Sequence, residues 1–260
     1  MKLFLYNFYD NGDVVLSRPL IRAVSKLKNV EILLCVPPKK MYLIEDLGEV
    51  VPGKYPCKHI SMSCNHKGTP VGYISMSMWF GTFRGVLKRW GLSWHNLQLT
   101  WNKQIKLRSL PSSMKIGPQD PVVDFPDVFD YDVRSNSVFV ENGPVRSKQS
   151  DIKVPVKWIV ESFPELNFYF SDAPGVVADN CFDVSRLNLR QLSKVSEKCL
   201  GFLTRGSGVN TCTYTKQNKG KPRALLGWTD SYCLWPYSGD DVKHVRNKKQ
   251  ISRFLRGMLR

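Results

Sequence analysis

The chain begins MKLFLYNFYDNGDVVLSRPLIRAV (residues 1–24), and this stretch indicates the class of fold. An apolar run rich in aromatic residues stops at a turn, residues 11–13, and apolar residues at helical spacing follow from Pro19. The next run, VEILLCVP (30–37), is apolar on nearly both faces, which is typical of a buried parallel strand. A strand, a turn, a helix and a second buried strand predict a doubly wound α/β domain.

The same order of segments returns in the second half of the chain. SVFVENGP (137–144) is predicted to be a strand, residues 154–166 have a helical pattern, and NFYFSDAPG (167–175) is predicted to be a strand that enters a loop. Between the halves, residues 109–136 are rich in Pro, Ser and Asp without a sustained period, as linkers are. The second half therefore predicts another α/β domain.

These patterns set the expected domain organisation. We expect an N-terminal Rossmann-like domain at residues 1–125 and a C-terminal Rossmann-like domain at residues 126–240. Residues 241–260 have apolar side chains at helical spacing and basic residues on the other faces, which predicts a basic amphipathic helix.

The composition is that of a globular protein, with 260 residues, 42% hydrophobic and 23% charged. No apolar stretch reaches the roughly 18 residues of a membrane span, and the N-terminus lacks the pattern of a signal peptide, so we expect a cytoplasmic protein. The seven cysteines are odd in number and scattered, which favours reduced thiols. Cys57, His59, Cys64 and His66 match no standard zinc spacing, so we expect no metal.

Positive charge is concentrated in two regions of the sequence. The net charge is +16, and residues 211–260 hold eleven Lys or Arg against three Asp. Residues 84–108 hold six basic residues and no acid. Such regions attract polyanions, including nucleic acid and phosphorylated molecules, although a solvated basic surface is the alternative interpretation.

A glycine-containing turn, RGSGVNT (205–211), follows a predicted strand in the second half. Ligands of open α/β sheets bind outside the carboxyl ends of the strands. Glycines allow the backbone to approach a ligand closely, and a helix start offers N–H groups to an anion, so the turn suits a diphosphate. A tight turn without a ligand is the alternative. The residues of this predicted donor loop are Arg205, Gly206, Ser207, Gly208, Val209, Asn210 and Thr211.

Asp13 occupies the equivalent turn in the first half and has two possible roles. As a helix N-cap it would contribute about 1 kcal/mol by accepting a bond from the first helical turn. As a general base it would take the proton from an acceptor hydroxyl at the mouth of a cleft. The segment by itself favours the cap.

The aromatic and basic residues of 79–101 have two possible interpretations. They could form a surface that stacks bases or sugars, or a helix face packed into a core.

Two segments resemble one enzyme family. NGDVVLSRPLIRAV (11–24), after a strand, resembles the N-terminal signature of heptosyltransferase-like glycosyltransferases (family nine), a G-D turn before a helix with Thr/Ser-x-Pro near its start. Residues 183–211 resemble the helix, strand and D-S-G-P-M-H donor loop of that family. The resemblance implies a GT-B architecture, with two Rossmann-like domains facing across a cleft and a C-terminal helix that crosses back to the first domain.

The resemblance also implies an activity. It is the inverting, metal-independent transfer of a hexosyl or pentosyl group from a nucleoside-diphosphate sugar to an acceptor hydroxyl, without a cofactor. The family's general base maps onto Asp13. The donor site adds to the donor loop Asn142, Gly143, Arg146, Lys148 and Asp172. The acceptor site comprises Asn11, Gly12, Arg18, Trp79 and Arg84.

Two departures from the family's donor loop leave the nucleotide undefined. Gly206 stands where the family has Asp, and Thr211 stands where it has His. The basic regions make a polyanionic acceptor an expectation, either DNA with a hydroxymethylated base or a phosphorylated glycan. The alternative is a non-catalytic GT-B-like protein that binds nucleic acid.

Overall fold

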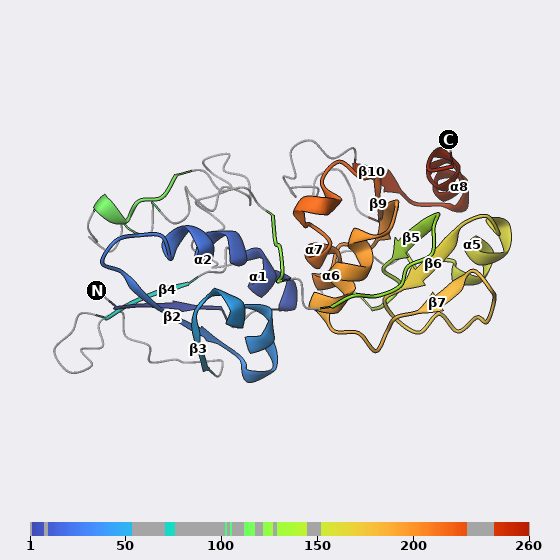
Figure 1. Cartoon of the computed structure of the whole chain (residues 1–260). Helices are drawn as coiled ribbons and strands as arrows, with labels where there is room; N and C mark the ends of the chain where they lie inside the picture. The colour runs from blue at the N-terminus through green and yellow to red at the C-terminus, as the bar shows by residue number, and fades with distance from the viewer. Residues whose placement is uncertain are drawn as a thin grey trace. The chain divides into compact units, whose positions relative to one another are not determined.

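The computed structural model describes residues 2–7, 10–53, 71–75, 102, 105, 112–117, 122–126, 129–144, 152–227 and 242–259. The chain divides into two compact units after residue 121 (Figure 1). Each unit has its own parallel sheet. The α/β class predicted from the sequence is therefore confirmed.

The first unit has a four-stranded sheet in the order β3-β2-β1-β4, with all strands parallel. Its strands are β1 (Lys2–Tyr6), β2 (Glu31–Val36), β3 (Glu49–Pro52) and β4 (Val71–Ser75). Two short 3-10 helices, η1 (Pro38–Leu43) and η2 (Glu45–Leu47), lie between β2 and β3.

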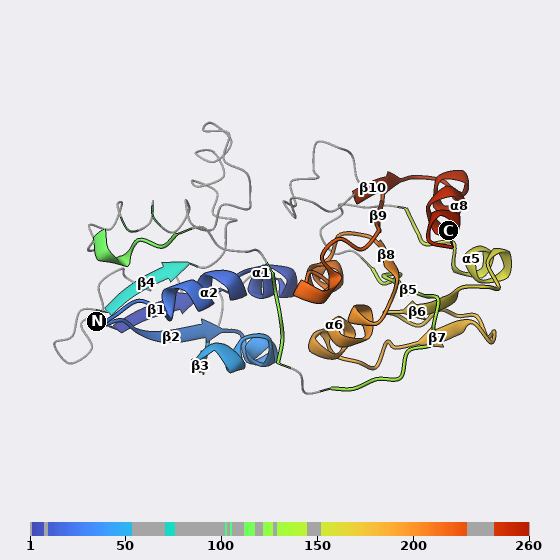
Figure 2. The same ribbon diagram turned by 45° about the horizontal axis from the view of Figure 1, so that its top comes forward.

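Two helices, not one, follow β1. They are α1 (Asn11–Leu16) and α2 (Arg18–Val24), and they run along the first sheet in Figure 2. The break falls at Ser17, whose hydroxyl donates to the Val14 carbonyl at 2.5 Å. Pro19 has no N–H to continue the hydrogen-bond ladder, so α2 starts as a separate helix. The turn predicted at residues 11–13 is thus the first turn of α1.

The second unit has a six-stranded parallel sheet in the order β10-β9-β8-β5-β6-β7. Its strands are β5 (Ser137–Val140), β6 (Asn167–Phe170), β7 (Cys181–Asp183), β8 (Gly201–Thr204), β9 (Arg223–Leu226) and β10 (Val242–Val245). Numbered from its own first strand, this is the 3-2-1-4-5-6 order of Rossmann domains, read from the other edge.

Helices cover both faces of the second sheet, with α5 and α8 on one side and α6 and α7 on the other (Figures 1 and 2). They are α5 (Val156–Ser162), α6 (Leu189–Glu197), α7 (Gly208–Cys212) and α8 (Lys248–Gly257), with the 3-10 turn η4 (Lys216–Asn218). Helix α6 begins later than the helical pattern from residue 183 suggested. Its start is set by Asn188, whose side chain accepts from the Arg190 and Gln191 N–H groups.

The C-terminal helix belongs to the second unit. Ile251, Phe254 and Leu255 of α8 are buried in one core cluster with residues of β5 and β9, including Val138 and Leu226. The described contacts of these three side chains thus place α8 in the core of the second unit. Its apolar stripe is already covered by the sheet of its own unit.

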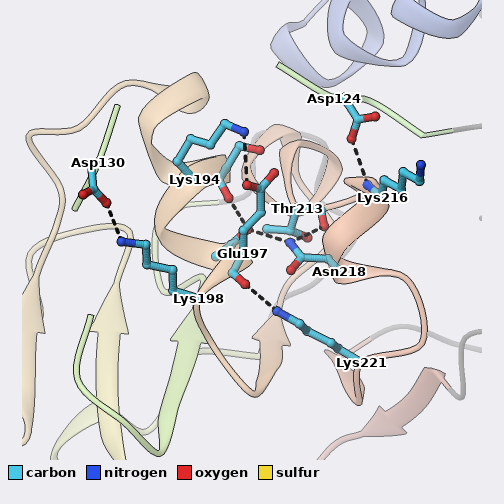
Figure 3. Close-up of polar contacts among 11 residues, drawn as sticks. Asp124, Asp130, Lys194, Glu197, Lys198, Thr213, Lys216, Asn218 and Lys221 are labelled. Atoms are coloured by element: carbon cyan, nitrogen blue, oxygen red, sulfur yellow. Dashed lines mark hydrogen bonds and ion pairs between the residues drawn. The ribbon is translucent and has the colours of Figure 1, made fainter. Parts of the chain in front are cut away.

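The connecting segment joins the second unit earlier than the boundary expected at residue 126. The Val123 N–H donates to the Tyr214 carbonyl at 2.8 Å, and the Lys216 N–H donates to the Asp124 carboxylate at 2.8 Å. Further along, Lys198 contacts Asp130 at 2.5 Å (Figure 3). These bonds attach an irregular segment to the α6 and η4 side of the second unit.

Gly201, at the start of β8, provides a stability test. A Cβ at this position would lie 2.7 Å from the Pro222 carbonyl oxygen and 3.0 Å from the Met258 sulfur. We expect Gly201→Ala to lower the free energy of unfolding by about 2 kcal/mol, because the backbone oxygen cannot yield without moving the strand. Urea unfolding followed by circular dichroism measures the change.

Gly257→Ala is the matched control, because a Cβ there meets nothing within 4 Å and the position lies at the end of a helix. We expect it to be neutral or slightly stabilising. Equal losses in the two variants would show that the close approach at Gly201 does not limit the packing.

Candidate active site

The strand order gives each unit one point at which a ligand is expected. In the second sheet, the chain proceeds outward from β5 to one edge and outward from β8 to the other edge. In the first sheet, the corresponding point lies between β1 and β4. Ligands of open α/β sheets bind at such switch points, outside the carboxyl ends of the strands. The residues that follow β1, β5 and β8 are therefore the first to consider.

Asp13 lies in the first turn of α1, which follows β1. The N-cap of this helix is Asp10, whose side chain makes no capping hydrogen bond, so the interpretation of Asp13 as the N-cap is wrong. Asp13 is the third residue of the helix, and its carboxylate accepts the backbone N–H of Asp10. The buried Asn7 side chain donates to the Asp13 carbonyl at 2.9 Å and attaches this turn to the end of β1.

The Asp13 carboxyl has a pKa near neutrality. The pKa of this carboxyl is raised from the ordinary 3.8 to about 7, mainly by burial and secondly by the nearby negative charge of Asp10. Lys40 and the backbone N–H bonds oppose this rise without cancelling it. A carboxyl with such a pKa can both accept and release a proton at neutral pH, which is the property of a general base.

Arg18, predicted to bind the acceptor, is fully buried. Its guanidinium donates to both carboxylate oxygens of Asp46, at 2.7 and 2.6 Å, and to the Leu43 carbonyl at 2.6 Å. This bidentate pair attaches α2 to the η1–η2 segment. We therefore leave Arg18 out of the proposed acceptor site, whereas Asn11 and Gly12 lie beside Asp13 in the first turn of α1 with Asn11 exposed.

Glu141, which the sequence reading did not select, lies at the switch point of the second sheet. It follows β5 directly and is 1% exposed. One carboxylate oxygen accepts the Arg205 N–H at 2.7 Å and the Gly206 N–H at 3.1 Å, and the other accepts the Ser207 hydroxyl. A signal was present, because an acid directly after an apolar strand is the pattern that selected Asp13.

The donor loop is accordingly arranged differently from the sequence prediction. That prediction offered the backbone N–H groups of residues 205–211 to a diphosphate, but two of them bind Glu141. Ser207 is the N-cap of α7 and accepts the Val209 N–H at 3.2 Å. Gly206 has φ of 78°, a conformation that favours glycine at this turn.

The side chains of Asn210 and Thr211 are buried and support the loop from inside. The Thr211 hydroxyl donates to the Ser207 carbonyl at 3.1 Å, and Asn210 accepts from the Arg223 guanidinium at 2.8 Å. Arg223 is itself fully buried, 4.2 Å from the centre of the Phe202 ring and 4.0 Å from that of Tyr214. The aromatic faces stabilise this cation at the base of α7.

The structure brings together most of the described donor residues at the carboxyl ends of β5, β6 and β8. The Asn142 amide donates to the Asp172 carbonyl at 2.8 Å and accepts the Asp172 N–H at 2.9 Å. The Arg205 guanidinium donates to the Gly143 carbonyl at 2.6 Å. The remaining predicted contacts lie outside the described residues: Trp79, Arg84, Arg146 and Lys148.

The basic C-terminal region is not one uniform patch. Arg223 is buried, and the Lys221 ammonium group donates to the Glu197 carbonyl at 2.6 Å (Figure 3). By contrast, the β10–α8 segment, residues 242–259, presents six exposed basic residues and contains no acid. They are Lys243, Arg246, Lys248, Lys249, Arg253 and Arg256. Within the described part of the region from residue 211, the exposed basic residues are these six together with Lys216 and Lys219.

The described part of the chain contains neither a helix long and apolar enough to cross a membrane nor a group of three or more potential metal ligands. Cys57, His59, Cys64 and His66 lie outside it. Burial raises the pKa of the Cys199 thiol to about 12, as expected for an unreactive core cysteine.

No protein-family model and no curated protein matches this chain. Solved structures match it over almost its entire length. The ADP-heptose LPS heptosyltransferase II of E. coli aligns at a TM-score of 0.60 and 12% identity, over 100% of this chain and 98% of that one. The chain has the GT-B fold.

Two further GT-B structures agree with this assignment. E. coli heptosyltransferase WaaC with ADP-2-deoxy-2-fluoro heptose aligns at a TM-score of 0.54 and 10% identity, over 99% of both chains. The glycosyl transferase family 9 protein of Veillonella parvula DSM 2008 aligns at 0.52 and 12% identity, over 98% of this chain and 89% of that one. The GT-B architecture implied by the sequence resemblance is confirmed.

Proposed function

We propose that this protein is a glycosyltransferase that moves a sugar from a nucleoside-diphosphate sugar to an acceptor hydroxyl, with inversion and without a metal ion. The observation that carries the proposal is the Asp13 carboxyl, with a pKa of about 7, at the switch point of the first sheet in a GT-B chain. Asp13 takes the hydroxyl proton as the acceptor oxygen bonds to the anomeric carbon. The bond from that carbon to the diphosphate oxygen breaks, and the nucleoside diphosphate leaves.

The proposed donor site lies at the carboxyl ends of β5, β6 and β8. Its described residues are Asn142, Gly143, Asp172 and the loop from Arg205 to Val209. Because Glu141 holds two of the loop's N–H groups, positive side chains have the larger part in neutralising the leaving diphosphate. Arg205 supplies one such charge, and Arg146 and Lys148 follow β5 in the sequence. WaaC has been solved with ADP, so ADP is the first nucleotide to test.

The six exposed basic residues of the β10–α8 segment support a polyanionic acceptor. DNA with a hydroxymethylated base and a phosphorylated glycan both offer a hydroxyl next to phosphate charge. If all six cations contact DNA phosphates, affinity falls roughly a thousandfold between about 50 and 200 mM salt. Fluorescence anisotropy of labelled duplex DNA across this range measures the slope, and a flat response would favour a neutral acceptor.

Glu141 supports a second candidate, a non-catalytic GT-B-like protein that binds nucleic acid. A carboxylate in the place where a donor phosphate would meet the loop is consistent with a chain that no longer binds nucleotide sugars. The two candidates differ in one measurable property, which is whether any nucleoside diphosphate binds.

A thermal-shift panel of ADP, GDP, UDP, CDP and TDP tests the proposal. We expect one nucleotide to stabilise the protein, by about 2.7 kcal/mol at a hundred times its Kd. Asp13→Asn should keep this stabilisation, because Asp13 serves the acceptor. If DNA binds and none of the five diphosphates raises the Tm, the non-catalytic candidate holds instead.

A further inference from the structure

Glu141 is a buried carboxylate to which the proposed reaction gives no step. It is 1% exposed and sits where the strand order of the second sheet reverses. Its three hydrogen-bond donors are the Arg205 N–H, the Gly206 N–H and the Ser207 hydroxyl, which are consecutive residues between β8 and α7. A single side chain, 64 residues earlier in the sequence than the first of these donors, therefore holds the whole turn.

The three donors form a cradle for an anion. Two successive N–H groups that bind one oxygen are the arrangement that holds phosphate and other anions at turns. The cradle also lies at a switch point, where such anions bind in open α/β sheets. Here the chain's own carboxylate fills it, so a phosphate cannot use the same two N–H groups.

The charged group that faces Glu141 among the described residues is Arg205, which attracts the ionised carboxylate. From the end of β6, Asp172 faces Asn142 and Gly143 instead. Burial raises the pKa of Glu141, and the hydrogen bonds from Ser207, Arg205 and Gly206 oppose that rise. The donors therefore offset only part of the cost of desolvation, and the pKa of Glu141 stays above its ordinary value.

We propose that Glu141 is a positioning residue, which holds the loop Arg205–Ser207 so that a nucleoside diphosphate binds on the outside of a cradle already filled by this carboxylate. This inference rests on the proposed nucleotide site. The inference has a consequence for binding, because the Glu141 carboxylate and the diphosphate then lie against the same short loop and repel each other. Nucleotide binding is favoured when Glu141 is protonated, and the affinity falls as pH rises through the pKa of Glu141.

Glu141→Gln separates the charge from the contacts. The amide oxygen can accept both backbone N–H groups, and the amide nitrogen can donate to the Ser207 oxygen, so the cradle stays filled without a charge. Glu165→Gln is the matched control, an exposed carboxyl in the same unit. Binding of ADP, or of whichever diphosphate in the panel binds the wild type, is measured by isothermal titration calorimetry at a series of pH values over the range in which the protein stays folded.

We expect Glu141→Gln to bind the diphosphate about tenfold more tightly than the wild type in which Glu141 is ionised, and to lose most of the pH dependence. Glu165→Gln should follow the wild-type profile. If the wild type binds the diphosphate and Glu141→Gln has the same affinity and pH profile, the inference is overturned while the proposed function stands. If the wild type binds none of the five diphosphates, the proposed function is overturned and the inference with it.

Ser207→Ala keeps the inference testable if the Gln variant does not fold. Removing the hydroxyl takes away a donor that lowers the pKa of Glu141, so this pKa rises. The pH at which nucleotide affinity begins to fall should therefore move upward relative to the wild type. An unchanged or downward-shifted profile would contradict the assigned role of Glu141.

Discussion

Asparagine in place of Asp13 will reduce sugar transfer by about a thousandfold, because the acceptor hydroxyl loses the group that removes its proton. The side chain keeps its size and the N–H of Asp10 keeps an acceptor, so the loss is one of chemistry rather than of structure. In the wild type, the rate should rise with pH as Asp13 ionises around pH 7. The measurement is kcat for release of the nucleoside diphosphate, with donor binding checked separately.

The same substitution will stabilise the protein above neutral pH. The folded-state pKa of about 7 exceeds the ordinary 3.8, so folding disfavours the ionised form. The resulting cost is absent below about pH 4 and fully present above about pH 7, where it could reach about 4 kcal/mol without solvent screening. Because Asp13 is partly exposed, we expect a gain of about 2 kcal/mol at pH 8 and none at pH 4. Urea unfolding at the two pH values measures the difference.

Asp10→Asn is the control for both effects. Asp10 makes no side-chain capping bond, and its charge raises the pKa of Asp13. We expect this variant to remain active, with its rate rising at lower pH than in the wild type. Full activity in Asp13→Asn, or an unmoved profile in Asp10→Asn, would remove Asp13 from the role of base.

Removing the carboxylate that pairs with Arg18 should produce the largest stability loss. The Arg18 side chain is 0% exposed and that of Asp46 is 19% exposed, with the closest contact at 2.6 Å. In Asp46→Ala the buried Arg18 guanidinium keeps its hydrogen bond to the Leu43 carbonyl but loses its counter-charge. Breaking a buried pair costs 3–5 kcal/mol, and the partial exposure of Asp46 places the expected loss at about 3 kcal/mol. Chemical unfolding monitored by circular dichroism measures the loss.

Glu45→Ala, a change of the exposed neighbour in η2, should cost less than about 1 kcal/mol. Replacing both members of the pair, as Arg18→Met with Asp46→Ala, should recover part of the loss, because no unpaired charge is then buried. Additive costs in the double variant would mean that the two charges do not stabilise each other. The stability of α2 would then depend on packing alone.

The sequence predicted the strands that are almost entirely apolar and missed the partly exposed edge strands. Strands β1, β2, β5, β6, β8 and β9 and helix α8 are apolar or amphipathic over enough residues to be recognised. The edge strands β3, β7 and β10 are about as short as β5, β6 and β8, but they include exposed residues and so lack a continuous apolar run. The start of the six-residue helix α1 was taken for a turn because Asn11, Gly12 and Asp13 are all residues that favour turns.

Some residues of the candidate site could be predicted from the sequence, and others could not. Asp13 and the 205–211 loop could be selected because each is a short motif directly after a strand. Glu141 could not be linked to that loop, since its donors lie 64 to 66 residues further along the chain. Arg18 was predicted to bind the acceptor, whereas in the structure it is buried and paired with Asp46, 28 residues later.

The sequence by itself determined the alternation of strands and helices, and hence the α/β class, because hydrophobic periodicity is local along the chain. It also placed an acid and a glycine turn at two strand ends. Tertiary structure decided the rest: the order of the strands, the raised pKa of Asp13, the pairing of Arg18 and the occupation of the donor loop by Glu141. Each of these depends on burial and on contacts between residues far apart in sequence, and neither is encoded in any single segment.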